Sequence, residues 1–474
     1  MNFRLLAFLT FALLLGSPRA HGFALNGPPN ASYQVAALNY DGTLAPQVLG
    51  EEYRWNVPIL TYGFDSAFIN YFGTNGIRAI EAAFRQMNDL PAVSLITDQV
   101  LTNTFPLNSQ GNNPAAAALF MTDIRSRMLT ILVEFMGLSD AERFTWCLRN
   151  RWVDAIPSTN YVVIQRNYDP ITRTPTDTVN GQKLGYTVLD GPPADAYEID
   201  PAGGGGFFIG LIQGRSVSSV LSWSVGTSFS SLTYDDVGGL RYLYATNNFN
   251  VENLLPTVAV TSTAASAATG SPWSPVGVTN ILTVVGSGAV NTALRGGIDK
   301  VSFVRVDFDS LLGFGFAGVT NTWTDRYVAP SSQTATIQQQ TLARSIVRPD
   351  IIISARDLGL ANNLPIEITR VTGNYVNHDG INGLAGQNGP GVLTVPFQLR
   401  VDFTTQFPYY IDGPRLIGPP PIGGGFGGGF GNLQYSGVWG WFDDTTIYKT
   451  FPDFLNLQFS DLERMVLEAR TLIK

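Results

Sequence analysis

The stretch Asp123–Leu138, DIRSRMLTILVEFMGL, decides the fold of the N-terminal part of this chain. Apolar residues in and just before it recur at steps of four, four, four and three: Phe120, Ile124, Met128, Leu132 and Phe135. That spacing places them on one face of a helix with about 3.6 residues per turn. Gly137 permits the left-handed conformation that ends many helices. The pattern predicts a buried central helix, and a purely structural role is the simplest interpretation of it.

The first 22 residues, MNFRLLAFLTFALLLGSPRAHG, have the three parts of a secretory signal peptide. Arg4 supplies the positive charge, and Leu5–Leu15 is an apolar run too short to span a membrane comfortably. Small residues then stand at both positions of a cleavage site in Ala20-His21-Gly22. We expect a signal peptide over residues 1–22, cleavage after Gly22, and a secreted protein that lies outside the cell or on its surface. No later stretch is long and apolar enough to predict a membrane span.

The charge balance excludes two classes of partner. The chain has a net charge of −8, and removal of the signal peptide with Arg4 and Arg19 makes the charge more negative. An acidic protein is unsuited to bind nucleic acid or an anionic membrane surface. Cys147 is the only cysteine, so an intrachain disulfide is excluded.

Residues 23–255 are predicted to form one domain of mixed strands and helices. Alternating apolar residues in Tyr53–Phe64 predict a strand, in which Pro58 favours an edge position or a break. A helix is expected over Gly76–Met87, and a last helix is expected to begin at the capping residue Thr233. The remaining expectations are strands at residues 92–105 and 160–166 and a loop at residues 108–118.

The composition changes beyond residue 255, so the sequence predicts an α+β multidomain protein. Residues 256–273 are rich in Ala, Ser and Thr and are predicted to be a linker. Short β-favouring runs separated by Gly, Asn and Pro predict an antiparallel β-sandwich or barrel over residues 274–412. Residues 413–431, GPRLIGPPPIGGGFGGGFG, are predicted to be a flexible tether. Residues 432–474 are an aromatic segment that is expected to end in a helix.

Four segments of the N-terminal part are informative because of their order along the chain. They are Phe23–Pro28 (FALNGP), Ile59–Phe64 with the helix after it, Asp123–Leu138, and Leu232–Tyr244 (LTYDDVGGLRYLY). In that order they resemble the matrixin branch of the metzincin proteases. The resemblance implies a matrixin-like α/β fold in which Asp123–Leu138 stands for the active-site helix. It does not extend to residues 257–474.

The zinc motif of that family, HExxHxxGxxH, is degenerate here. In the motif three His bind zinc and the Glu is a general base. The matching segment keeps Glu134, but Val133 and Gly137 stand at the first two ligand positions. The chain has only two His, His21 in the predicted signal peptide and His378, so a catalytic zinc would lack its three ligands. The resemblance therefore implies a pseudoenzyme in which Glu134 is a relic of the catalytic base.

Two further groups of polar residues carry weaker signals. Asp307 and Asp309 share one face of a predicted strand and could act as the carboxylate pair of a glycosidase, although a solvated sheet face is the simpler interpretation. Asn377, Asp379 and Asn382 lie in a Gly-rich loop and offer oxygen ligands for Ca²⁺. Their spacing does not match an EF-hand loop, so a cluster of turns is the simpler interpretation. The sequence predicts no cofactor, with calcium as the alternative.

Two classes of function follow from the sequence. The preferred one is a non-catalytic extracellular structural or binding protein that contacts a protein or a carbohydrate at the cell surface. The alternative is a secreted hydrolase, a peptidase or a glycosidase, that uses carboxylates. The apolar segment 432–474 is expected either to dock on a neighbouring copy, giving self-association, or to fold back on its own chain.

Overall fold

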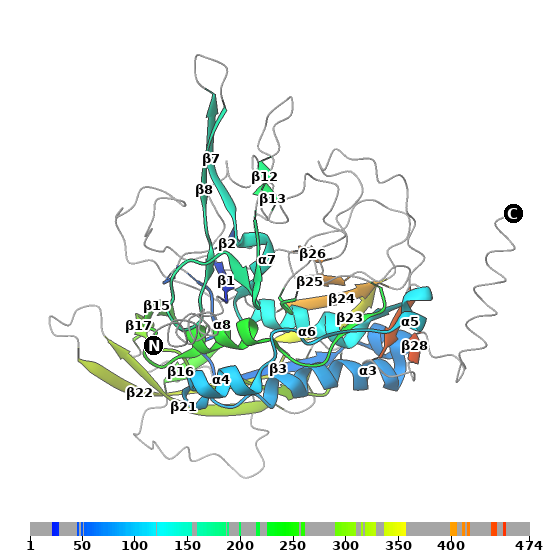
Figure 1. Ribbon diagram of the computed structural model, residues 1–474. Coiled ribbons are helices and arrows are strands. Elements are labelled where there is room, and N and C mark those ends of the chain that lie inside the picture. Colours follow the sequence, from blue (N-terminus) through cyan, green and yellow to red (C-terminus); the bar gives the residue numbers. More distant parts are fainter. Residues whose placement is uncertain are drawn as a thin grey trace, which may run out of the picture.

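The computed structural model describes residues 21–27, 45–46, 49–50, 52–119, 121–153, 159–185, 187–188, 199–200, 215–218, 225–255, 257–260, 290–309, 314–315, 318–328, 336–356, 399–404, 410–412, 415–417, 438–442 and 449–451. Over these residues the protein has a mixed α/β architecture with several sheets and few helices (Figure 1). The coarse expectation of a mixed α and β protein is therefore confirmed. None of the described helices is long and apolar enough to cross a membrane.

A six-stranded mixed sheet organises the fold, with the strand order β18-β3-β23-β24-β25-β26. Its members are β18 (Ser302–Arg305), β3 (Ile59–Phe64), β23 (Ile351–Arg356), β24 (Leu399–Thr404), β25 (Tyr410–Asp412) and β26 (Arg415–Ile417). The first four strands run parallel, and β25 and β26 are antiparallel additions. Strand β3 lies inside this sheet, so Pro58 marks the start of the strand and not a sheet edge.

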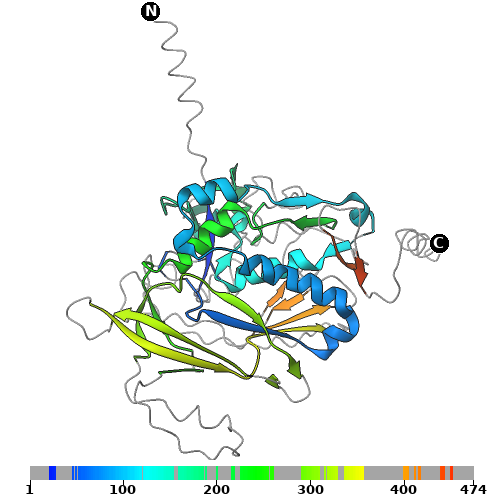
Figure 2. The ribbon, with the colours of Figure 1, turned by 90° about the horizontal axis from the view of Figure 1, so that it is seen from below.

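This sheet corrects the expected division of the chain into independent domains. Strand β3 belongs to the N-terminal part, yet both of its neighbours, β18 and β23, lie beyond residue 300. Figure 2 shows the blue strand β3 in one sheet with the orange strands near the C-terminus. The described strands of residues 274–412 therefore do not form an independent antiparallel domain. The reason is physical, because alternating apolar residues identify a strand but do not specify the strand with which it pairs.

A second, five-stranded sheet is antiparallel throughout, with the order β15-β17-β21-β22-β16. Its members are β15 (Asn250–Asn253), β17 (Thr292–Arg295), β21 (Val319–Val328), β22 (Ile337–Ile346) and β16 (Val258–Val260). The antiparallel character expected for this part of the chain thus holds throughout this sheet, whereas the six-stranded sheet is mixed. Strand β16 falls within the predicted linker 256–273, so the start of that segment is a paired strand and not a linker.

Helix α3 (Ser66–Asn88) follows β3 and packs against β18, β23 and helix α6 (Ile124–Phe135). The carboxylate of Asp65 caps α3 by accepting a 3.0 Å hydrogen bond from the Ala67 N–H. Gly73, with φ of 59°, interrupts the helix, so the expected helix over Gly76–Met87 is its second segment. Figure 1 shows α3 and α6 extending across the body of the protein.

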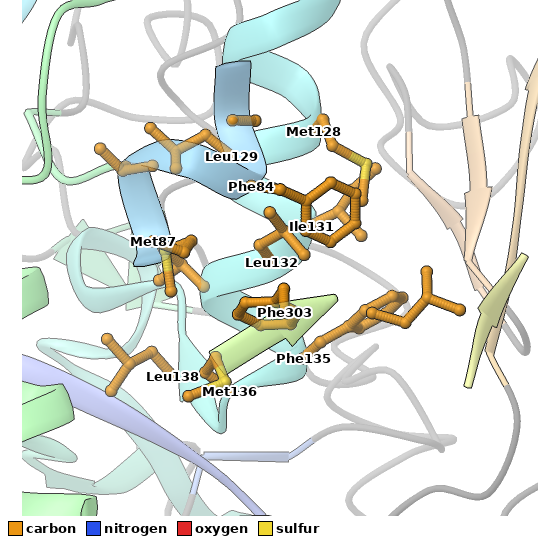
Figure 3. Packing of buried hydrophobic residues seen from close by; sticks show 14 of the residues in the cluster. Phe84, Met87, Met128, Leu129, Ile131, Leu132, Phe135, Met136, Leu138 and Phe303 are labelled. Carbon is orange, nitrogen blue, oxygen red and sulfur yellow. The ribbon is translucent and has the colours of Figure 1, made fainter. Parts of the chain in front are cut away.

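Helix α6 confirms the prediction made from Asp123–Leu138, and it is more deeply buried than one apolar face requires. All of its residues except Arg125 are buried. Figure 3 shows Ile131 and Leu132 of α6 packed with Phe84 of α3 and Phe303 of β18. Gly137, with φ of 110°, ends the helix in the left-handed region, as its sequence position predicted.

Two local predictions between α3 and α6 are wrong. Residues 92–105 form a 3₁₀ turn, η1 (Val93–Leu95), and helix α4 (Asp98–Thr104) instead of a strand. The Thr97 side chain caps α4 by accepting from the Val100 N–H. This local hydrogen bond favours a helix over a strand at this position. The expected loop at residues 108–118 contains strand β4 (Gln110–Asn112) and helix α5 (Pro114–Ala118).

The start of the described chain is built into the fold as strand β1 (Phe23–Gly27). It pairs with β2 (Ala45–Pro46), β6 (Leu138–Ser139) and β9 (Asn167–Tyr168). The short helix α7 (Ala141–Phe144) follows β6 and contacts β1. The last helix, α8 (Tyr234–Tyr244), also contacts β1 and begins at Thr233 as predicted.

Several two-stranded ribbons complete the N-terminal part. The expected strand at residues 160–166 is confirmed as β8, which pairs with β7 in a hairpin that projects from the body in Figure 1. The members of these ribbons are β7 (Cys147–Val153), β8 (Thr159–Ile164), β10 (Thr178–Val179), β11 (Gln182–Lys183), β12 (Thr187–Val188), β13 (Ile199–Asp200) and β14 (Thr227–Phe229), which pairs with β4. Further along the chain, β19 (Phe308–Asp309) pairs with β20 (Phe314–Gly315).

The described part of the apolar C-terminal segment folds back on its own chain. Strand β27 (Val438–Trp441) pairs in parallel with β5 (Met121–Asp123), directly before α6, and antiparallel with β28 (Lys449–Phe451). Trp439 is buried in the main core, and its ring lies 5.2 Å from that of Phe403. The expected terminal helix and most of the predicted tether lie outside the described residues, although Arg415–Ile417 of the tether forms β26.

Members of two buried ion pairs make hydrogen bonds that join the two parts of the chain. Arg54 binds Glu252 over 2.5 Å and also donates to the carbonyl of Arg295 over 2.7 Å. Asp350 binds Arg344 and accepts a 2.8 Å hydrogen bond from the Thr61 N–H of β3. Because each buried charge depends on its partner, these contacts link β3 and its approach to the C-terminal sheets.

Candidate functional site

The segment Val133–Gly137, which the sequence comparison aligned with a zinc motif, lies in the core. Val133 is fully buried, and Glu134 has 4% of its surface exposed. The backbone carbonyl of Glu134 accepts a 3.3 Å hydrogen bond from the Asn26 side chain of β1, which covers the end of the helix. A catalytic base must reach a substrate or an attacking water. The position of Glu134 among core residues does not provide that access.

Gly137, which the resemblance aligned with the second ligand, has no room for a side chain. A Cβ placed there would lie 2.2 Å from the carbonyl oxygen of Tyr53 and 3.2 Å from a methyl carbon of Leu243. Its φ of 110° is also a conformation that side-chain-bearing residues rarely adopt. A His at position 137 would therefore require movement of the backbone around Tyr53.

A buried group of four carboxylates lies nearby, where α7 and α8 begin. It comprises Asp140, Glu142, Asp235 and Asp236, and we call it the acidic cluster. Asp140 and Glu142 flank the start of α7, and the other two occupy the first turn of α8. Carboxylates suit these places because the first turn of a helix exposes backbone N–H groups.

Asp236 organises the segment before α8 by a capping box with Thr233. Its Oδ2 accepts 3.0 Å hydrogen bonds from the N–H groups of Thr233 and Val217. Its Oδ1 accepts a 2.6 Å hydrogen bond from the hydroxyl of Ser216. Glu142 contacts the same segment, because its Oε1 accepts from the N–H groups of Arg215 and Ser216 over 2.7 and 2.9 Å. The carboxylates of Glu142 and Asp236 thus hold residues 215–218 against the starts of helices α7 and α8.

Asp235 faces the start of the described chain. Its Oδ2 accepts hydrogen bonds from the N–H of Gly22, over 2.9 Å, and from the N–H of Asn180. Its Oδ1 is buried and has no hydrogen-bond partner among the described atoms. The nearest basic atom is Nδ1 of His21, 3.9 Å from Oδ1, and the His21 ring lies 4.1 Å from the ring of Tyr234.

Burial perturbs the titration of this cluster. Loss of solvent and the neighbouring carboxylate of Asp140 raise the pKa of Glu142 from 4.5 to about 7. Burial also raises the pKa of Asp235 well above its ordinary value, and the charges of Asp236 and Glu142 add to that rise. Such shifts arise because a charged carboxylate is costly in a medium of low dielectric constant. Shifted carboxylates accompany catalytic sites, but they also occur in structural networks.

The other predicted site residues are not brought together. Asp307 is exposed beside Arg305, at 3.9 Å, and lies between β18 and β19, whereas Asp309 is part of β19. Asp307 and Asp309 therefore do not lie in one strand. The calcium candidates Asn377, Asp379 and Asn382 lie outside the described residues, and so does His378. Within the part of the chain that the structure describes, no three His, Cys, Asp or Glu side chains are grouped to hold a metal ion.

Reasoning from the sequence missed the contact between the chain start and α8. The sequence predicted His21 and Gly22 as the end of the signal peptide and did not predict that Asn180 meets Asp235. The Asp235-Asp236 pair after the capping Thr233 is the sequence feature that points to this site. Two adjacent carboxylates at a buried helix start need hydrogen-bond donors from other segments of the chain.

Comparison with known proteins adds no relative: no protein-family model, no curated protein and no solved structure matches this chain.

Proposed function

We propose that the protein is exported and acts outside the cell or at its surface as a non-catalytic structural or binding protein, on a degenerate matrixin-like fold. The observation that carries this proposal is the burial of α6. Val133 and Glu134 lie in the core, and Gly137 has no room for a side chain beside the Tyr53 carbonyl. A helix covered in this way serves as a structural element.

The matrixin-like part of the proposal is supported by contacts between the segments that carry the resemblance. The hydroxyl of Tyr244 in α8 donates a 2.8 Å hydrogen bond to the carbonyl of Met136 at the end of α6. The Phe23 ring of β1 lies 5.6 Å from that of Tyr242 in α8. These segments, which are far apart in the sequence, thus pack around one another, as a common origin with that family requires.

The alternative function, a hydrolase based on carboxylates, is not favoured by the geometry. Glu142, Asp235 and Asp236 are buried, and each accepts hydrogen bonds from backbone N–H groups. A catalytic carboxylate must reach its substrate, and these buried carboxylates are held against backbone groups inside the fold. Binding of a protein or a carbohydrate partner, through a sheet edge for example, is compatible with this architecture.

The proposal is tested with the exported full-length protein and its Glu134→Ala variant, each incubated with casein and with a panel of glycosides. We expect no turnover above background, and no difference between the two proteins beyond a change in stability. A hydrolysis rate that is well above background in the wild type and disappears in Glu134→Ala would contradict the proposal.

A further inference from the structure

We propose that the signal peptide is cut between Ala20 and His21, two residues before the bond that the sequence pattern favours, and that the new N-terminal residue His21 is a structural partner of Asp235. This inference rests on the proposed export of the protein. It adds a processing site and assigns a role to the first two residues of the mature chain.

The first line of support is the burial of the residues that a cut after Gly22 would remove. His21 has 9% of its surface exposed, and Gly22 is buried as well. The His21 ring lies over Tyr234, and the Gly22 N–H donates to Asp235. A cut before Phe23 would remove the His21 side chain and the Gly22 N–H together. These two residues directly precede β1 and are buried with it in the folded domain.

The second line of support is the charge of the acidic cluster. Asp235 has 0% of its surface exposed, and its Oδ1 points into the protein without a hydrogen-bond partner among the described atoms. Within the described part of the chain, His21 is the only Lys, Arg or His side chain within 4.0 Å of it. A buried carboxylate without a positive partner is costly. The site is therefore built to receive positive charge from the direction of His21.

A cut after Ala20 supplies that charge. In the precursor, the backbone nitrogen of His21 is a neutral amide. Hydrolysis of the Ala20–His21 peptide bond consumes one water, leaves a carboxylate on Ala20 and converts that nitrogen into an amine, which is protonated at neutral pH or slightly below it. The mature residue then carries an ammonium group and an imidazole next to the cluster. Ala20 is also a small residue, as signal peptidases require before the cut bond.

The primary test is the N-terminal residue of the protein exported by a bacterial host from the complete gene, read by Edman sequencing and intact mass. We expect His21. A chain that begins at Phe23, or at any other residue, overturns the inference and leaves the proposed function intact. A protein that retains Met1 overturns both.

The role of His21 is tested separately by comparing mature chains that begin at His21 and at Phe23, each released from a fusion partner without extra residues. We expect the chain that begins at Phe23 to have a Tm lower by about 2 °C or more. In addition, Asp235→Asn should change the Tm of the two chains by different amounts. The Tm of the His21→Ala variant should fall toward that of the chain that begins at Phe23. The Tm of the matched control His378→Ala should fall less. Equal Tm values for the His21 and Phe23 chains would overturn the structural role.

Discussion

The backbone N–H of Phe442 donates a 3.1 Å hydrogen bond to Oδ1 of Asp123, the residue that caps helix α6. The other oxygen of Asp123 accepts from the N–H of Ser126 over 2.9 Å. One carboxylate thus holds the start of the central helix and the end of strand β27, residues that are more than 300 positions apart. The C-terminal strand is therefore part of the structure that supports α6.

Replacement of Asp123 should release the C-terminal strand. Asp123→Ala removes both sets of hydrogen bonds, and we expect the free energy of unfolding to fall by about 2 kcal/mol, with faster amide hydrogen exchange in β27. Thr97→Ala, which removes the cap of α4, is the matched control and should leave exchange in β27 unchanged. Equal exchange rates in β27 for the two variants would contradict the link between Asp123 and the C-terminal strand.

Gly137 should not tolerate even a methyl group. Gly137→Ala places a Cβ 2.2 Å from the Tyr53 carbonyl oxygen in an unfavourable backbone conformation, so we expect a loss of about 3 kcal/mol or more in urea unfolding. Gly73→Ala is the control, because Gly73 also has a positive φ but has nothing within 4 Å of its Cβ position. We expect that variant to lose less than Gly137→Ala, because its cost is backbone strain alone. A Gly137→Ala protein as stable as Gly73→Ala would show that position 137 has room.

Burial of Glu142 predicts a pH dependence with a definite sign. Because the pKa of Glu142 is about 7 in the folded protein and 4.5 ordinarily, the folded state binds the extra proton between these values. The contribution of this group to stability is therefore complete below pH 4.5 and is lost as the pH rises through 7. Glu142→Gln keeps an oxygen for the Arg215 and Ser216 N–H groups and carries no charge.

We expect Glu142→Gln to be more stable than the wild type by about 1 to 3 kcal/mol at pH 8 and to show little difference at pH 4.5. Urea unfolding at the two pH values measures this difference. Glu81→Gln, at a partly exposed position that pairs with Arg305 over 2.6 Å, is the control and should show no such gain at pH 8. A Glu142→Gln protein that is less stable than the wild type at pH 8 would show that the folded protein benefits from the charged form.

The buried pair of Arg54 and Glu252 should help the N-terminal and C-terminal parts to unfold together, because Arg54 also donates to the carbonyl of Arg295. Glu252→Ala leaves Arg54 buried with carbonyl partners only, so we expect a loss of about 3 kcal/mol and one cooperative transition. Asp98→Ala breaks a pair of similar length, 2.6 Å, in which Asp98 is 60% exposed, and it should cost less than about 1 kcal/mol. Two separate transitions in the wild type would indicate independent domains after all.

The sequence was informative where structure depends on local interactions. The helix at Asp123–Leu138 and its end at Gly137 follow from apolar spacing and one glycine, and Thr233 follows from capping chemistry. The expectation of short strands beyond residue 274 agrees with β18, β22, β23 and β24. The pairing of the strands was not predicted. The neighbours of β3 lie more than 200 residues away along the chain, and no periodicity specifies them.

The candidate site was harder to predict for the same reason. Asp235 and Asp236 were visible as a pair in the first turn of a helix, but their partners Gly22, Asn180 and Ser216 come from three distant segments. Glu134 was placed correctly on a helix. Its burial depends on how β1 and α3 pack around α6, which the apolar pattern of α6 alone does not determine.

The most direct test of the central claim, that this fold has no working zinc centre, is the metal content of the exported full-length protein after it is equilibrated with zinc and freed of unbound metal. Elemental analysis should find far less than one zinc per chain, with the Glu134→Ala protein giving the same value. One tightly bound zinc per chain, together with casein hydrolysis that a chelator stops, would contradict the claim.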